Sequence, residues 1–246
     1  MSRRHPAWIR PDWPAPAQVR AFATTRLGGV SEPPYASFNL GDHVGDDPDH
    51  VARNRKRLRD LLQLPAEPCW LNQVHGRDVV EAGNGAAFQA DGAWTAARGT
   101  VCAVLTADCL PVLLCDRQGR RVAALHAGWR GLAAGVLEAG VEALGCRGGE
   151  VMAWLGPAIG PLAFEVGEEV RAVMVDHDTQ AAAAFTANRS GHWLADLYAL
   201  ARQRLEACGV EAVYGGDRCT HTERDHFFSY RRDGVTGRSA SLIWLA

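Results

Sequence analysis

Three almost continuous apolar segments lie near the middle of the chain, at residues 100–106, 111–115 and 121–126. A short connection separates the first two, and a turn at 116–119 separates the last two. Short apolar runs bounded by turn residues are typical of strands that are buried on both faces. These segments therefore predict neighbouring strands that form the central sheet of the protein.

The flanking sequence predicts further strands and helices. Asp47 is a good helix cap, Pro48 suits the first turn, and Pro65 stops the helix. The apolar face of this helix is expected to consist of Val51, Leu58, Leu61 and Leu62. The remaining pattern predicts strands at 18–26, 69–74, 78–81, 150–155 and 212–214, helices at 131–144, 166–175 and 194–208, and a terminal hairpin of 227–230 with 240–245.

Strands and helices are mixed along the chain without strict βαβ alternation, which favours an α+β fold. We expect a single layered α/β domain with a mixed central sheet. Residues 1–17 are rich in Pro, Trp and Arg and are predicted to form an irregular lead-in to a single domain at 18–246. A chain of 246 residues is long enough to bury a core of this kind.

Composition limits which classes of partner the protein is expected to bind and indicates the compartment in which it is expected. The net charge of −2 gives no global field that would attract nucleic acid or an acidic membrane surface. No apolar stretch approaches the roughly twenty residues that span a bilayer, and the N-terminus does not resemble a signal peptide. The seven cysteines are odd in number and contain no C-x-x-C pair. These features predict a cytoplasmic protein without a disulfide framework, and we expect a monomer.

Three segments place a metal-capable side chain at a strand end or in a tight connection. His75 ends one predicted strand, Cys109 lies between two apolar strands, and His126 ends the next strand. If these strands are neighbours, their ends lie about 5 to 10 Å apart. Two imidazoles and a thiolate suit Zn²⁺, and three protein ligands leave a fourth position open for water or substrate. The pattern therefore suggests a catalytic zinc site.

Other interpretations use the same side chains. The gaps of 34 residues from His75 to Cys109 and 17 from Cys109 to His126 match no compact zinc motif. Cys109 with a histidine base would make a cysteine hydrolase, and two His with one Cys also suit a copper centre. A structural zinc in a non-enzymatic scaffold would need a fourth protein ligand, for which His43, His221 and Cys219 are candidates.

An ordered set of motifs resembles one known family, the YfiH family of laccase-domain or polyphenol oxidase proteins. The motifs extend from about residue 20 to the C-terminus in the same order as in the family. They are Phe22-Ala-Thr-Thr-Arg26-Leu-Gly-Gly29-Val-Ser31, Asn39-Leu40, His43-Val-Gly-Asp-Asp47, Asn72-Gln-Val-His75-Gly76, Ala90-Asp91-Gly92, Ala107-Asp-Cys109-Leu-Pro111, His126-Ala-Gly-Trp-Arg130, Leu155-Gly-Pro157 and Phe228-Ser-Tyr-Arg231-Arg-Asp233.

This resemblance implies a layered α/β fold related to the catalytic domain of the cytotoxic necrotizing factor toxins. It also implies one zinc ion held by His75, Cys109 and His126, which match the family pattern without departure. The implied activities are phosphorolysis of adenosine, inosine and methylthioadenosine, with adenosine deamination. The family has also been linked to peptidoglycan editing and to copper-dependent oxidation of polyphenols.

The histidine pattern argues against a multicopper oxidase, because none of the nine histidines forms the His-x-His pair that the laccase name implies. A single open zinc fits phosphorolysis and deamination better. In deamination, a carboxylate must move a proton, and Asp91 and Asp108 are candidates that would equally serve as turn caps.

Phosphate recognition requires cationic donors, and arginine supplies them in bidentate geometry. Arg26 and Arg231 are the favoured phosphate ligands, and Arg55 and Arg130 are less favoured because arginines on or near helices commonly belong to a solvated face. Asn39, Asn72 and Gln73 are candidates to bind a sugar hydroxyl or a base edge, with turn stabilisation as the alternative role. The expected partners are therefore a purine nucleoside and phosphate.

Overall fold

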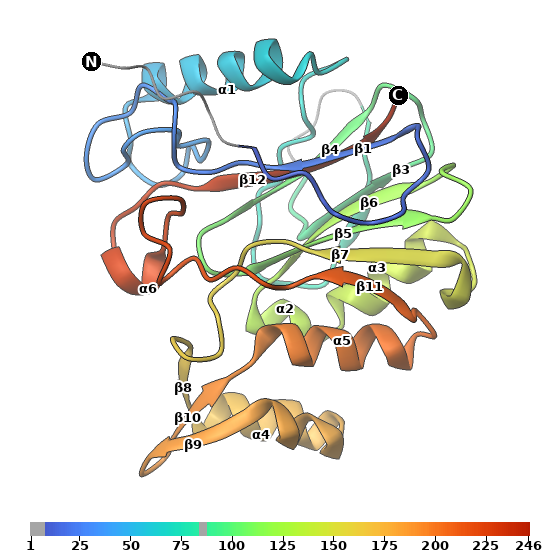
Figure 1. The fold of residues 1–246 in the computed structure, drawn as a ribbon, viewed down its shortest axis with the longest axis vertical. Helices are drawn as coiled ribbons and strands as arrows, with labels where there is room; N and C mark the ends of the chain where they lie inside the picture. Colours follow the sequence, from blue (N-terminus) through green and yellow to red (C-terminus); the bar gives the residue numbers. More distant parts are fainter. Residues whose placement is uncertain (1–7, 84–87) are drawn as a thin grey trace.

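Two sheets pack face to face and carry helices on their outer sides (Figure 1). The computed structural model describes residues 8–83 and 88–246. The larger sheet has the strand order β11 (Ala212–Gly215), β7 (Val151–Leu155), β5 (Leu110–Asp116), β6 (Val122–Ala127), β3 (Gly92–Thr95) and β2 (Val79–Glu81). The smaller sheet has the antiparallel order β1 (Val19–Ala23), β12 (Ser239–Leu245) and β4 (Val101–Thr106).

Helices cover the two outer faces. Helix α1 (Pro48–Leu62) packs on the smaller sheet, whereas α2 (Trp129–Ala134), α3 (Val136–Leu144) and α5 (Leu197–Ala207) pack on the larger one (Figure 1). A third small sheet of β8 (Glu165–Gly167), β10 (His192–Ala195) and β9 (Phe185–Arg189) packs with α4 (Glu168–His177). The short elements are η1 (Gly148–Glu150), η2 (Thr179–Ala184) and α6 (Tyr230–Asp233).

The larger sheet is mixed, which confirms the predicted fold class. Its β11–β7 and β2–β3 pairs are parallel and its other pairs are antiparallel. Strand β5 shows no alternation of apolar and polar residues, because both of its faces are buried. Val112 and Leu114 face the helices, and Leu113 and Cys115 face the smaller sheet. The relation to the cytotoxic necrotizing factor toxins stays a prediction.

One part of the predicted central sheet is wrong. Residues 100–106 form β4, which belongs to the smaller sheet and pairs with β12, whereas β5 and β6 are neighbours in the larger one. Cys102 and Val104 face the core between the sheets, and Ala103 and Leu105 face α1. Because both sheets bury both faces of such a strand, its apolar character does not indicate which sheet it joins.

The predicted helix at 131–144 is interrupted. Helix α2 ends and α3 begins at Gly135, whose φ of +94° is left-handed and whose amide donates back to Gly131 and Leu132. Glycine adopts this conformation without the steric cost that other residues incur. Gly145 ends α3 in the same conformation, as predicted.

The predicted terminal hairpin is wrong. β12 pairs with β1 on one side and with β4 on the other, so residues 227–230 have no free edge to join. Ser229 instead caps α6, because its hydroxyl accepts a hydrogen bond from the Arg232 amide. The predicted strand at 69–74 is also absent; Cys69 and Asn72 make only isolated bridges.

Three helix predictions need smaller corrections. Leu61 is exposed on α1, although Val51 and Leu58 are buried as expected. Helix α1 ends at Leu62, before the predicted stop at Pro65. Helices α4 and α5 begin later than predicted, because residues 166 and 194 belong to strands β8 and β10. Strands β3, β8, β9 and β10 were not predicted.

The described part of the lead-in packs on the domain. Ile9 exchanges two backbone hydrogen bonds with Ala23, and the Trp8 ring meets Phe38 edge-on at 5.5 Å between centroids. In residues 8–83 and 88–246, no helix combines the length and the apolar character that a membrane crossing requires.

Candidate metal centre

Asp91 organises the loop that carries His75. The carboxylate precedes β3, is fully buried and accepts hydrogen bonds from the backbone amides of Val74 (3.2 Å), His75 (2.9 Å) and Gly76 (2.6 Å). His75 has a φ of +61°, so it lies in a tight loop rather than at the predicted strand end. Three converging amides therefore fix the backbone at His75.

The same carboxylate orients His126. The imidazole Nδ1–H donates to Asp91 Oδ1 at 2.8 Å, and the His126 amide donates to the Asp91 carbonyl at 2.7 Å. Because Nδ1 is engaged, Nε2 is the nitrogen left for a ligand. A histidine held by a carboxylate in this way is the usual support of a metal-bound imidazole. Asp91 thus positions two of the three predicted ligands.

Cys109 lies in the connection from β4 to β5, which crosses between the two sheets. Asp108 makes the turn with a φ of +93°. Its carboxylate accepts hydrogen bonds from the Thr220 hydroxyl (2.6 Å), the Ser229 hydroxyl (3.0 Å) and the Arg231 amide (2.7 Å). These bonds tie the Cys109 turn to the C-terminal loops, so Asp108 has a clear positioning role.

The three predicted ligands meet. His75, Cys109 and His126 present donor atoms that all lie within 4.8 Å of one another, and Cys109 Sγ is 3.9 Å from His75 Nε2. The two imidazole rings are 4.8 Å apart at an interplanar angle of 72°. Within the described ranges, this is the one cluster of three or more His, Cys, Asp or Glu residues with such spacing.

The electrostatics of the cluster favour a thiolate. Burial alone would raise the pKa of Cys109, but the charge and hydrogen bond of His126 and the hydrogen bond of His75 lower it to about 6. Burial would lower the pKa of His126, but the Cys109 thiolate and the hydrogen bond to Asp91 raise it to about 9. The two shifts share a cause, the mutual attraction of Cys109 and His126, which favours the thiolate and the protonated imidazole over the neutral pair.

This donor set fits zinc. Two imidazole nitrogens and a thiolate are ligands that Zn²⁺ prefers, and Asp91 supplies the outer support. Gly128 leaves room for them, because a Cβ there would lie 2.9 Å from Cys109 Sγ and 3.1 Å from His75 Cδ2. The same set would accept copper, so the donors alone do not identify the metal.

The cluster opens on a cavity of about 250 Å³. Aromatic and cationic side chains make much of its wall, so it offers both flat apolar surface and positive charge. The lining residues are His75, Ala107, Asp108, Cys109, Trp129, Arg130, Ile159, Phe164, Leu197, Tyr230 and Arg231.

Only Arg231 of the four predicted substrate-binding residues lines this cavity. Arg26 donates to the carbonyls of Ala36 and Arg224 and lies over the Phe228 ring. The Asn39 amide is fully buried and bonds to Asp46, Gly41 and the Arg238 amide. Asn72 is exposed and lies outside the cavity lining that the structure describes. Arg26 and Asn39 therefore stabilise loops.

The remaining candidates from the sequence divide into residues with structural roles and one that lines the cavity. Gln73 bonds twice to the Leu105 backbone, and Arg55 pairs with Asp42 at 3.3 Å and lies over Trp70, so both have structural roles. Arg130 lines the cavity beside the metal ligands. The sequence underrated it because its position at a helix start resembles a solvated face.

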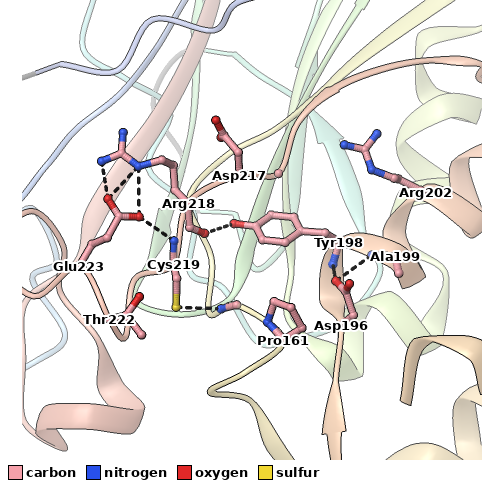
Figure 2. A pocket seen from close by; sticks show the side chains of 12 residues that line it. Pro161, Asp196, Tyr198, Ala199, Arg202, Asp217, Arg218, Cys219, Thr222 and Glu223 are labelled. Atoms are coloured by element: carbon pink, nitrogen blue, oxygen red, sulfur yellow. Dashed lines mark hydrogen bonds and ion pairs between the residues drawn. The ribbon is translucent and has the colours of Figure 1, made fainter. Parts of the chain in front are cut away.

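None of the candidate fourth ligands joins the cluster in the part of the chain that the structure describes. His43 is exposed beside Asp42. Figure 2 shows Cys219 in a second cavity of about 510 Å³, where its sulfur accepts a hydrogen bond from the Gly160 amide at 3.2 Å. The larger cavity therefore contains none of the three clustered ligands, and the candidate centre keeps an open side.

Comparison with known proteins places this arrangement in a family. Residues 20–246 match the family described as multi-copper polyphenol oxidoreductase laccase, and the chain belongs to this family. Its members among known proteins include YfiH proteins, as the sequence motifs predicted.

Two relatives illustrate the similarity. The chain is 57% identical over 240 residues to the purine nucleoside phosphorylase PA4543 of Pseudomonas aeruginosa, covering 97% of this chain and 98% of that protein. It is also 57% identical over 239 residues to the purine nucleoside phosphorylase YfiH of Escherichia coli, covering 96% and 98%.

Solved structures share the fold. Protein NMB0706 of Neisseria meningitidis has a TM-score of 0.94 and 53% identity, covering 97% of this chain and 98% of that one. YlmD of Geobacillus stearothermophilus has a TM-score of 0.91 and 33% identity, covering 100% and 98%. The fold therefore persists where two thirds of the residues differ.

Proposed function

We propose that this chain is a zinc-dependent purine nucleoside phosphorylase that acts on adenosine, inosine and methylthioadenosine and also deaminates adenosine. The observation that carries the proposal is the cluster of His75, Cys109 and His126 opening on a cavity with aromatic and arginine walls. The names of relatives at 57% identity support the phosphorylase assignment. The open side of the cluster supports a catalytic rather than a structural metal.

His75, Cys109 and His126 would hold the zinc ion. When bound there, zinc would supply Lewis-acid polarisation of an oxygen or nitrogen atom of the reactants. Asp91 keeps His126 in the tautomer that presents Nε2, and it holds the His75 loop through three amides. The protein's contribution is thus a ligand set whose backbone and imidazole are held in place by hydrogen bonds to Asp91.

The cavity suits the two reactants. Trp129, Phe164 and Tyr230 provide aromatic surfaces of the kind that contact a purine ring. Arg130 and Arg231 provide charge for a phosphate dianion. In phosphorolysis, a phosphate oxygen forms a bond to C1′ of the ribose while the bond from C1′ to the purine nitrogen breaks. Both reactants must therefore occupy the cavity together.

Deamination would require a carboxylate near the base. Asp108 lines the cavity, whereas the two oxygens of Asp91 are occupied by His126 and the amides of residues 74–76. We therefore assign the proton-transfer role in adenosine deamination to Asp108 and the positioning role to Asp91. Asp108 accepts three hydrogen bonds itself, so this role needs a free lone pair on the cavity side.

A product assay tests the proposal. Purified protein with inosine and phosphate is expected to release hypoxanthine and ribose 1-phosphate, and removal of either phosphate or zinc is expected to abolish release. Zinc restored after chelation should restore the rate, and Cys109→Ala should stay inactive. Equal release without phosphate would indicate a hydrolase and contradict the proposal.

The lowered pKa of Cys109 specifically favours a second candidate, a cysteine hydrolase in which the Cys109 thiolate is the nucleophile. That activity would persist in metal-free protein and leave a covalent adduct on Cys109, which peptide mass spectrometry detects. The zinc proposal expects the opposite, namely that bound zinc protects Cys109 from iodoacetamide.

We place this activity in the cytoplasm as a monomer. Seven free cysteines support a reducing compartment. Size-exclusion chromatography with light scattering checks the mass of 26.6 kDa, and a doubled mass would contradict the monomer.

A further inference from the structure

Two arginines line the candidate active-site cavity, and the structure uses them differently. The Arg231 guanidinium donates to the Glu165 carbonyl at 2.7 Å and lies 5.3 Å from the centre of the Phe164 ring. Its backbone amide donates to Asp108. Arg231 therefore connects α6, which forms part of the cavity wall, to β8. Some of its N–H donors already make hydrogen bonds within the protein.

The Arg130 guanidinium, in contrast, has N–H donors that remain available for a ligand. In residues 8–83 and 88–246, neither a hydrogen bond nor an ion pair engages it, and its contact is with the face of the Trp129 ring, 4.5 Å from the centroid. Stacking on a ring leaves the N–H groups around the guanidinium edge available. Arg130 is exposed and lines the cavity, so these donors can reach a solute inside it.

Its backbone is held close to the metal ligands. Arg130 follows His126 by four residues, and between them Gly128 approaches both Cys109 and His75. Gly131, the next residue, packs against the carbonyls of Gly76 and His126. The backbone at Arg130 is thus held from both sides, while the residue lines the cavity.

We propose that Arg130 binds the phosphate co-substrate through its guanidinium edge, and that Arg231 shapes the wall rather than providing the main phosphate contact. This inference rests on the proposed phosphorylase function and deepens it. A planar guanidinium with free N–H pairs matches two oxygens of a phosphate dianion, which a single ammonium does not. The Trp129 ring lies against the face of this guanidinium and leaves its edge for the phosphate.

Steady-state kinetics with varied inorganic phosphate test the assignment in the zinc-loaded protein. Arg130→Gln is expected to raise the KM for phosphate about 10- to 100-fold, as the loss of charge-assisted hydrogen bonds predicts, with the KM for inosine within about threefold of the wild-type value. Arg130→Lys should lie between wild type and Arg130→Gln. Arg20→Gln, on the exposed side of β1, is the matched control and should change neither constant.

Calorimetric titration with inorganic phosphate, at constant ionic strength and without nucleoside, gives a readout that does not need turnover. Wild type is expected to bind phosphate and Arg130→Gln to bind it at least about tenfold more weakly. A phosphate affinity unchanged in Arg130→Gln but reduced in Arg231→Gln would overturn the inference, and so would absence of phosphate binding by wild type. Phosphate binding that depends on Arg130, in a protein without phosphorolysis, would overturn the proposed function alone.

Discussion

Asp91 shows how one buried carboxylate can organise a candidate metal site from behind two of its predicted ligands. Its oxygens accept from His126 Nδ1 and from three consecutive amides that include His75. Burial opposes the ionised carboxylate, but these hydrogen bonds hold the pKa of Asp91 below its ordinary value. The negative charge is therefore retained where it is needed to orient two ligands.

Asp91→Asn is expected to weaken zinc binding about 10- to 100-fold, as loss of an outer-shell carboxylate commonly does. The asparagine amide would place N–H groups against backbone N–H donors and distort the His75 loop. Competition with a chromogenic chelator measures the affinity. Asp78→Asn is the control, because the Asp78 side chain is exposed and only its carbonyl contacts this region. Equal affinities of the two variants would contradict the assigned role.

The sequence predicted three metal-binding side chains that the structure brings together, but it misjudged what supports them. His75, Cys109 and His126 carry suitable donors, and their motifs match the family. The role of Asp91 could not be predicted, because it depends on a loop in which His75 adopts a φ of +61°. The structural role of Asn39 could not be predicted either, since its partners Asp46 and Arg238 lie on different segments.

At the scale of the element, two predicted ligands, His75 and Cys109, lie in connections, and the third, His126, lies near the end of a strand. Cys109 lies where the chain crosses from the smaller to the larger sheet, and His126 lies at the end of β6, opposite Pro111. Gly128 then lets the start of α2 approach Cys109 and His75. Its φ of −66° and ψ of 162° suit any residue, so only the space beside Cys109 and His75 requires glycine.

Gly128→Ala is therefore expected to lower zinc affinity by at least about tenfold, because the added Cβ would displace the Cys109 sulfur or the His75 ring. The fold should be retained, since the backbone conformation is unstrained. Zinc content after dialysis and far-UV circular dichroism check the two statements. Gly149→Ala, where a Cβ meets no atom within 4 Å, serves as the control. Full zinc retention in Gly128→Ala would refute the packing argument.

Elements with local signals were predicted well, and pairings between distant segments were not. The cap at Asp47 and the helix end at Gly145 could be predicted because residues next to them in the sequence determine both. The position of β4 depends instead on its pairing with β12, more than 130 residues away in the chain. The wrong hairpin at 227–230 has the same cause, because the two edges of β12 pair with β1 and with β4.

Across the whole molecule, depressed carboxylate pKa values link stability to pH. Burial raises the pKa of Glu223, but its hydrogen bonds from Arg218 and from the Cys219 amide outweigh burial and lower it. Its pKa is then lower in the folded than in the unfolded chain, so the unfolded chain binds more protons in acid. The contribution is present above the unfolded pKa and is lost as the pH falls through the folded pKa.

The free energy of unfolding is accordingly expected to fall as the pH decreases from 7 toward 3, and to fall less steeply in Glu223→Gln, which has no carboxylate to protonate. Urea titrations of metal-free protein at several pH values measure both slopes. Glu211→Gln, at an exposed position, controls for the loss of one charge. Parallel slopes for wild type and Glu223→Gln would contradict the linkage.

We propose that His75, Cys109 and His126 hold one zinc ion and leave one position open. X-ray absorption at the zinc edge of the purified protein tests it directly. We expect one sulfur at about 2.3 Å, two imidazole nitrogens at about 2.0 Å and one further light ligand that is not an imidazole. A second sulfur, a third imidazole, or a spectrum unchanged in Cys109→Ala would contradict it.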